Sequence, residues 1–166
     1  MAELPGIGAA LTCVDIGGGL APAPGCLNLD PVSGQGEWKR RIQDGIPLLD
    51  RSAHAVRASH VLEHIPAGQE RIDLFNEVWR VLVSGGTFEV IVPLVLAHGQ
   101  WVGTWHAFAD PTHVSYWCLP ESFLYFCEGP FKPCADYGMR IWAPLDEERD
   151  TEVRGGWEGR VVMRKP

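Results

Sequence analysis

The chain has 166 residues, of which 46% are hydrophobic and 21% charged, and its formal net charge is −7. This composition predicts one folded domain over residues 1–166 and excludes an intrinsically disordered chain. An acidic surface repels phosphate backbones, so we expect no direct binding to duplex nucleic acid. There is no apolar run of ~20 residues and no signal-peptide pattern, which predicts a cytoplasmic protein without membrane contact.

The cysteines are odd in number and irregularly spaced. The chain has five cysteines and no Cys-x-x-Cys pair. Spacing of this kind is typical of an intracellular protein. We therefore expect reduced, buried thiols, and neither a disulfide nor a zinc site, at Cys13, Cys26, Cys118, Cys127 and Cys134.

Short apolar runs and one amphipathic stretch predict alternating strands and helices. The expected strands, in chain order, are residues 10–16, 26–30, 38–42, 54–59 and 87–92, followed by an antiparallel pair at 140–143 and 160–163 with a polar, acidic loop between them. Helices are expected between residues 66 and 82 and, more briefly, over 120–127. An aromatic loop is expected from residue 94 to residue 119.

The order of these elements predicts an α/β fold. We expect a Rossmann-like, open, mostly parallel sheet of about seven strands with a C-terminal antiparallel pair. Only nine residues, 17–25, separate the first two strands, and they include three consecutive glycines and two prolines. Because a parallel crossover ordinarily needs a dozen residues, the first crossover helix is expected to be missing or very short. The apolar sheet surface left uncovered would favour a homodimer through this thinly covered face.

A glycine-rich turn follows the first expected strand, in the pattern Asp15-x-Gly17-x-Gly19. It is either an ordinary turn or a place where a ligand approaches the backbone closely. Asp30 ends the second strand, where a carboxylate can accept hydrogen bonds from both hydroxyls of a ribose. It lies eleven positions after Gly19, too early for the usual dinucleotide spacing of about 20 residues. Without a helix N-terminus to hold a pyrophosphate, this spacing favours S-adenosylmethionine over NAD.

Asp44-Gly45 precedes the strand expected at 54–59. Asp44 can accept a hydrogen bond from an adenine amine while the adjacent backbone contacts the edge of the ring. The alternative is an ordinary Asp-Gly turn, which such a dipeptide commonly forms.

Five blocks in this order resemble the class I S-adenosylmethionine-dependent methyltransferases of the type 11 group, and in particular a compact subgroup of them. The blocks are Cys13-Val-Asp-Ile-Gly-Gly-Gly19, Leu27-Asn-Leu-Asp-Pro31, Ala58-Ser-His-Val-Leu-Glu-His-Ile65, Glu77-Val-Trp-Arg-Val-Leu82 and Gly85-Gly-Thr-Phe-Glu-Val-Ile-Val-Pro93. The resemblance covers residues 11–93, the expected cofactor half. The chain departs from the pattern in its shortened first crossover and in Val83-Ser84, where Lys-Pro is common.

The resemblance implies a role for each matching position. It assigns the methionine part of the cofactor to Asp15, Gly17 and Gly19, the ribose to Asp30, the adenine to Asp44 and Gly45, and the sulfonium to Ser59 and His60.

The motif His60-x-x-Glu63-His64 has a spacing that can chelate a divalent ion. Some RNA 3′-end methyltransferases bind a metal at a similar place, with a glutamate where His60 stands, and His106 or His113 is available to complete such a set. In the alternative, Glu63 and His64 hold the loop and the helix start by hydrogen bonding. We favour this alternative and expect no metal.

The segment 94–128 follows the strand beside the expected cofactor, so we expect it to form the acceptor pocket and its lid, with C-terminal strands over 129–166. Candidate general bases in it are His106, His113 and Asp110. The expected function is methyl transfer from S-adenosylmethionine to an oxygen or nitrogen of a small molecule or sugar. A non-catalytic S-adenosylmethionine-binding module and a metal-dependent RNA methyltransferase are the alternatives.

Overall fold

The computed structural model describes residues 12–32, 37–102, 105–129, 136–145, 147–153 and 156–166. Its elements are β1 (Thr12–Ile16), β2 (Cys26–Leu29), the 3-10 helix η1 (Ile42–Asp44), β3 (Ala53–Ser59), the 3-10 helix η2 (Leu62–His64), α1 (Gln69–Val81), β4 (Leu82–Ala97), β5 (Gln100–Trp101), α2 (Trp105–Ala109), β6 (Trp117–Leu119), α3 (Glu121–Leu124), β7 (Glu147–Val153) and β8 (Gly156–Arg164). None of the described helices has both the length and the apolar character that a membrane span requires.

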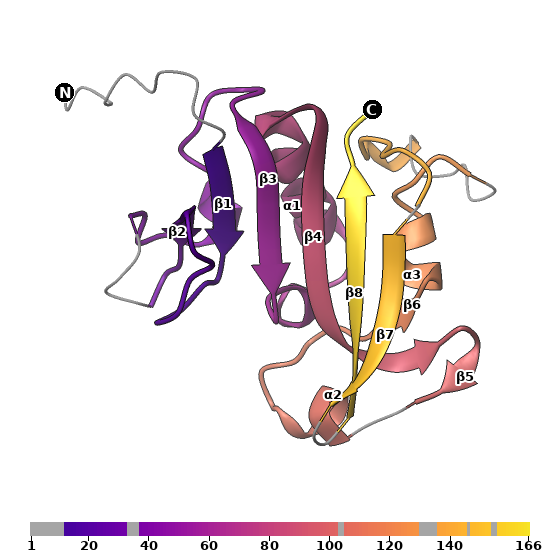
Figure 1. Ribbon diagram of the computed structural model, residues 1–166. Coiled ribbons are helices and arrows are strands. Elements are labelled where there is room, and N and C mark those ends of the chain that lie inside the picture. The colour runs from indigo at the N-terminus through magenta and orange to yellow at the C-terminus, as the bar shows by residue number, and fades with distance from the viewer. Residues whose placement is uncertain (1–11, 33–36, 103–104, 130–135, 146, 154–155) are drawn as a thin grey trace.

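The strands form one eight-stranded sheet whose main path runs β2-β1-β3-β4-β8-β7, with β5 and β6 paired to β4 (Figure 1). The strands β2, β1, β3 and β4 are parallel, β8 is antiparallel to β4, and β7 is antiparallel to β8. This arrangement confirms the expected open, mostly parallel α/β sheet with an antiparallel C-terminal pair.

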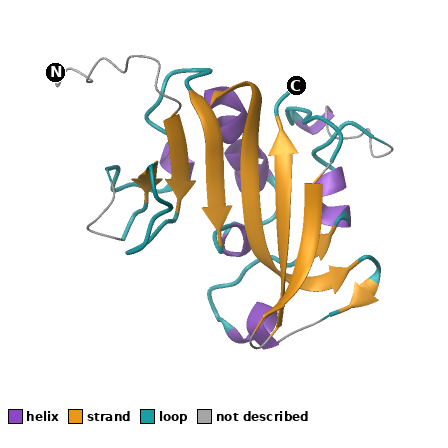
Figure 2. Ribbon diagram, viewed as in Figure 1, coloured by secondary structure: helices purple, strands orange, loops and turns teal. Residues whose placement is uncertain are grey.

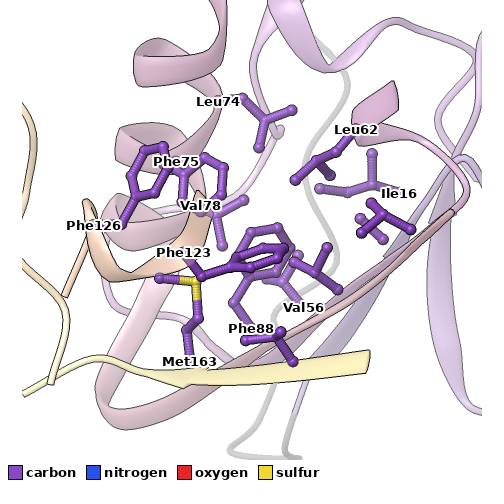
Figure 3. Packing of buried hydrophobic residues seen from close by; sticks show 14 of the residues in the cluster. Ile16, Val56, Leu62, Leu74, Phe75, Val78, Phe88, Phe123, Phe126 and Met163 are labelled. Atoms are coloured by element: carbon purple, nitrogen blue, oxygen red, sulfur yellow. The ribbon is translucent and has the colours of Figure 1, made fainter. Parts of the chain in front are cut away.

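One face of the sheet forms the core against α1 (Figure 3). The helix buries Leu74, Phe75, Val78 and Val81, which recur on one side at helical spacing. Phe75 stacks on Phe126 of the segment after α3, with ring centroids 3.8 Å apart. The helix ends earlier than its apolar pattern indicates, because residues 82–86 already belong to β4 and enter the sheet through a register shift opposite β3.

Two expected strands are wrong. Residues 38–42 contribute a single parallel bridge between Trp38 and Leu29 and then turn into η1. The C-terminal hairpin uses residues 147–153, which we expected to be a loop, whereas Trp142 makes only an isolated bridge with Cys127 and packs fully buried in the core. The strand β7 lies at the edge of the sheet, where charged side chains are tolerated. Its acidic sequence therefore did not indicate a strand.

The first crossover contains only turns between residues 17 and 25, which confirms that its helix is missing. In Figure 2, α1 and α3 lie behind the sheet, and no described helix covers the front of β1, β3 and β4. That front face is not apolar, contrary to our expectation. A row of ion pairs crosses it, from Asp15 to Arg57 (3.5 Å), from Arg57 to Glu89 (3.3 Å) and from Glu89 to Arg160. Charged side chains therefore occupy the sheet face that lacks a covering helix. An apolar surface at this place would need such a helix to shield it from water.

The expectation of five reduced thiols is wrong for Cys13 and Cys26, which form a disulfide between β1 and β2. The two residues are direct partners in the parallel register, with Cα atoms 4.4 Å apart, so both side chains lie on the same face. Cys118 and Cys127 form no disulfide with a described residue, and Cys134 lies outside the described residues.

Candidate active site at the carboxyl edge of the sheet

The carboxyl ends of β1, β2 and β3 meet at one edge of the sheet. Gly17 follows β1, Asp30 follows β2, and Ser59 ends β3 opposite Ile91 of β4. In open α/β sheets this edge is where ligands bind. The parallel register therefore brings together residues that the sequence alone places far apart.

The glycine turn lies very close to its neighbours. Gly17 has a φ of +70°, and a Cβ at this position would lie 2.5 Å from Cγ2 of Val61, just beyond β3. A Cβ on Gly18 would lie 2.6 Å from a carboxylate oxygen of Asp15 and 2.7 Å from the amide oxygen of Asn28. Only glycine fits at both positions, since any side chain would displace these groups.

Side chains, instead of a crossover helix, hold the glycine turn in position. The buried carboxylate of Asp15 accepts a hydrogen bond from the Ala23 N–H (2.7 Å). The amide of Asn28 accepts from the Gly18 N–H (3.1 Å) and donates to the Gly19 carbonyl (3.2 Å). Asn28 was not among the expected site residues. A polar residue between Leu27 and Leu29 of a short strand was a signal that this position has a role at the turn.

The carboxylate of Asp30 contacts the glycine turn before β2 and the residues that follow β2. One carboxylate oxygen accepts from the Gly19 N–H (3.0 Å) and the other from the Val32 N–H (2.8 Å). The side chain at the end of β2 therefore fixes the backbone on both sides of this strand.

Asp44 and Gly45 lie at the end of η1. The Asp44 carboxylate faces Arg41 of the same turn, with 3.7 Å between Nε and Oδ2. Gly45 lines a pocket of about 240 Å³ between η1 and α1. Glu77 of α1 lines the same pocket and accepts a hydrogen bond from the Ile46 N–H (2.7 Å), which fixes this loop to the helix.

His60 follows β3 in a left-handed conformation, with φ +55°, which is uncommon for a non-glycine residue. Its ring lies between two carboxylates, with Nδ1 3.3 Å from Glu63 and Nε2 3.0 Å from Glu158 of β8. Contact with the Glu63 carboxylate raises the pKa of His60, burial opposes this effect, and Glu158 adds to the rise. Nothing in the sequence pointed to Glu158, because it arrives from an antiparallel strand about a hundred positions away.

A second pocket, of about 440 Å³, opens at the same edge beyond His60. Its lining is rich in imidazole and carboxylate groups: His60, Glu63, His64, Pro93, Ala109, Asp110 and His113. Of the candidate bases, Asp110 and His113 therefore face this space. The side chain of His106 lies outside the described residues, although its backbone belongs to α2.

The two described candidate bases differ in character. Asp110 accepts hydrogen bonds from both the hydroxyl and the backbone N–H of Thr112, which lower its pKa and make it a weak base. His113 directs Nδ1 at the Ala107 carbonyl (3.1 Å), so its Nε2 carries the free lone pair.

Glu63 holds the loop by hydrogen bonding, as we favoured, but with its backbone and not with its side chain. Its side chain is 1% exposed, and neither carboxylate oxygen accepts a hydrogen bond from a described residue. Its backbone carbonyl, instead, accepts from the N–H groups of Val114 (2.8 Å) and Ser115 (3.1 Å) and holds the loop. His64 does hold the loop, through contacts of Nδ1 with the carbonyl (3.2 Å) and hydroxyl (3.1 Å) of Thr112.

The aromatic side chains of segment 94–128 divide into two sets. Trp117 and Phe123 are fully buried and belong to the core. In contrast, Trp101, Phe108 and Tyr116 are exposed. Trp101 stacks on Phe108, with ring centroids 5.9 Å apart, and Phe108 contacts Tyr116 at an interplanar angle of 43°, with centroids 4.9 Å apart. This exposed row includes α2, whose last residue, Ala109, lines the second pocket.

No protein-family model and no curated protein matches this chain. Solved structures do match in fold. A methyltransferase dependent on S-adenosylmethionine from Methanosarcina mazei aligns with a TM-score of 0.61 and 15% identity over 96% of this chain and 94% of that one. Another from Archaeoglobus fulgidus aligns at 0.61 and 12% identity, over 93% and 86% of the two chains. Phosphoethanolamine N-methyltransferase 2 from Haemonchus contortus, solved with S-adenosyl-L-methionine, aligns at 0.62 and 11% identity, over 98% of this chain and 50% of that one.

These likenesses establish the fold. The chain has the Rossmann-like α/β fold of S-adenosylmethionine-dependent methyltransferases, without the first crossover helix.

Proposed function

We propose that this protein transfers the methyl group of S-adenosylmethionine to an oxygen or nitrogen of a small molecule or sugar, as a member of the type 11 group. The observation that carries the proposal is the pocket of about 440 Å³, which opens beside the end of β3 at the same edge as the glycine turn. Val61 links the two, because it packs on Gly17 and directly follows His60 of the pocket.

The cofactor site of this proposal uses the residues at the strand ends. Asp15, Gly17 and Gly19 flank the methionine part and Asp30 binds the ribose, while Ser59 and His60 lie beside the sulfonium. Asp44 and Gly45 take the adenine, and the pocket of about 240 Å³ beside Gly45 provides space for a ring.

The reaction is an in-line displacement. A lone pair of the acceptor attacks the methyl carbon, the carbon–sulfur bond breaks, and the sulfur keeps the bonding pair as the neutral thioether of S-adenosylhomocysteine. The proton of the acceptor passes to a basic group of the pocket or to water. Positioning of the acceptor and the methyl group supplies most of the acceleration.

The test combines calorimetry with S-adenosylmethionine and transfer of a labelled methyl group to a panel of hydroxyl and amine acceptors. Ala109→Trp, at the exposed end of α2, fills the acceptor pocket, so we expect it to abolish transfer and preserve cofactor binding. Binding without any labelled product would favour the non-catalytic module instead. Absence of cofactor binding would contradict both functions.

The remaining alternative, a metal-dependent RNA methyltransferase, is disfavoured by the net charge of −7. A homodimer also remains a proposal, supported by the exposed Leu20 and Val32 on either side of the β2 edge strand. A strictly monomeric mass by light scattering at micromolar concentration would contradict it.

A further inference from the structure

We infer that Glu63, His64 and His113 form a binding site for a divalent transition-metal ion of the zinc type. The three side chains each direct a ligand atom into one space, and these atoms lie within 4.8 Å of one another. The site lies in the wall of the proposed acceptor pocket.

The first supporting observation is the state of Glu63. Its carboxylate is 1% exposed and accepts no hydrogen bond from the described residues. Its contact with Nδ1 of His60 involves one oxygen, and a buried carboxylate that lacks further donors is costly, whereas the same group bound to a cation is stable. His60 contacts Oε1 at 3.3 Å, so Oε2 is the oxygen left for a metal.

The second observation is the orientation of both imidazoles. His113 places Nδ1 against the Ala107 carbonyl (3.1 Å), and His64 places Nδ1 against the Thr112 carbonyl (3.2 Å). A carbonyl accepts only, so each Nδ1 carries a hydrogen, and in the neutral imidazole each Nε2 carries a lone pair. Histidine ligands in metal sites are ordinarily fixed by a hydrogen bond of this kind on the opposite nitrogen.

These orientations bring Nε2 of both imidazoles and the Glu63 carboxylate together, and Nδ1 of His60 contacts only Oε1 of that carboxylate. Nε2 of His113 lies 4.0 Å from Oε1 of Glu63, and the two imidazole rings have centroids 4.9 Å apart. A cation between the three groups satisfies all of them. Zinc bonds of about 2.1 Å in a tetrahedron place ligand atoms about 3.4 Å apart, so small side-chain rotations close the set around an ion.

The types of ligand at this site determine which ion it would bind. Two imidazoles and one carboxylate suit zinc and similar transition metals, whereas magnesium prefers oxygen ligands and near-octahedral geometry. Three protein ligands leave at least one coordination position open, as in catalytic zinc sites. On the proposed function, that position takes an oxygen of the acceptor and holds it in the pocket, and His113 is then a metal ligand and not the general base.

The test uses the full chain, treated with a chelator and titrated with Zn²⁺, Co²⁺ and Mg²⁺. We expect one equivalent of Zn²⁺ to bind and to raise the unfolding temperature by several degrees. Co²⁺ should give the visible absorption of a nitrogen-ligated ion, and Mg²⁺ should have no effect at the same concentration. Glu63→Gln and His113→Asn should each weaken Zn²⁺ binding by about 100-fold or more.

His98→Asn is the matched control, because this exposed histidine also faces a carboxylate, that of Asp150 at 3.8 Å. It should bind Zn²⁺ like the unchanged protein. If Glu63→Gln does not fold, His64→Asn replaces it, since the His64 side chain is exposed. The inference is overturned if the unchanged protein binds neither Zn²⁺ nor Co²⁺, or if the ligand variants bind them as well as the control does.

Cofactor calorimetry and the methyl-transfer assay are run on the same samples. Zn²⁺ binding without any methyl transfer leaves the metal site in place and contradicts the proposed function. Methyl transfer that continues unchanged in a chelated, metal-free protein supports the function and overturns the role of the ion in holding the acceptor.

Discussion

The carboxylate of Asp30 accepts a hydrogen bond from the backbone N–H of Gly19, with 3.0 Å between the two heavy atoms. The residue that the sequence assigns to the ribose therefore also holds the glycine turn. Where the first crossover helix is missing, side chains at the end of β2 take over the structural task of fixing the turn.

Replacing Asp30 by Ala should weaken S-adenosylmethionine binding about tenfold or more, because hydrogen bonds of a charged group are lost both to the turn and to the ribose. Isothermal calorimetry measures the change. Asp136→Ala, at an exposed position outside the site, serves as the control and should bind normally. Equal affinity in both variants would show that Asp30 is not part of the cofactor site.

The two glycines with positive φ at the turn should respond differently to alanine. Both substitutions place a Cβ in a left-handed conformation, at a cost of about 1–2 kcal/mol. Gly17→Ala also meets Val61, which adds about 1–3 kcal/mol, whereas a Cβ at Gly19 has no atom within 4 Å. Urea unfolding should therefore rank Gly17→Ala as less stable than Gly19→Ala, and the reverse order would contradict the structure of the turn.

Glu77 should make the free energy of unfolding depend on pH. The hydrogen bond from Arg80, opposed by burial and reinforced by the Ile46 N–H, lowers the pKa of this carboxyl. A folded pKa below the unfolded value of about 4.3 stabilises the protein above that pH, and this stability is lost as the pH falls through the folded pKa.

Glu77→Gln should therefore reduce the free energy of unfolding by about 1–3 kcal/mol at neutral pH. The difference from the unchanged protein should shrink as the pH falls below about 4.3. Urea unfolding at a series of pH values measures it. A difference that stays constant down to pH ~3 would mean that the Glu77 carboxylate has no special stabilisation in the fold.

The Cys13–Cys26 disulfide should protect both thiols from alkylation in denaturant until a reductant is added. Peptide mapping after labelling identifies the two residues, and Cys118, which carries a free thiol, should be labelled in denaturant without reduction. Loss of this link, which closes a loop of 13 positions, should lower stability by about 2–4 kcal/mol. Labelling of Cys13 before reduction would rule the disulfide out.

Sequence reasoning succeeded where the information is local. The strand before Gly17, the position of Asp30 and the short crossover all depend on residues within a few positions of one another, and all were predicted. The glycine turn and the polar residue at the strand end leave few conformations open, since the chain between them is too short for a helix.

Sequence reasoning failed where pairing with a distant strand determines the local structure. The acidic residues 147–153 form an edge strand only because β8 pairs with them, and the Cys13–Cys26 bond exists only because the parallel register makes these residues partners. Charge and spacing along the chain carry no information about either pairing.

The sequence by itself determined an open α/β sheet with a helix-free first crossover and a glycine turn beside Asp30. Only the tertiary structure decided that Glu158 meets His60 and that His113 faces the buried Glu63. The physical reason is that strand order and loop return bring these groups together across 50 to about 100 positions. The burial of the Glu63 carboxylate can likewise be recognised only after packing has enclosed it.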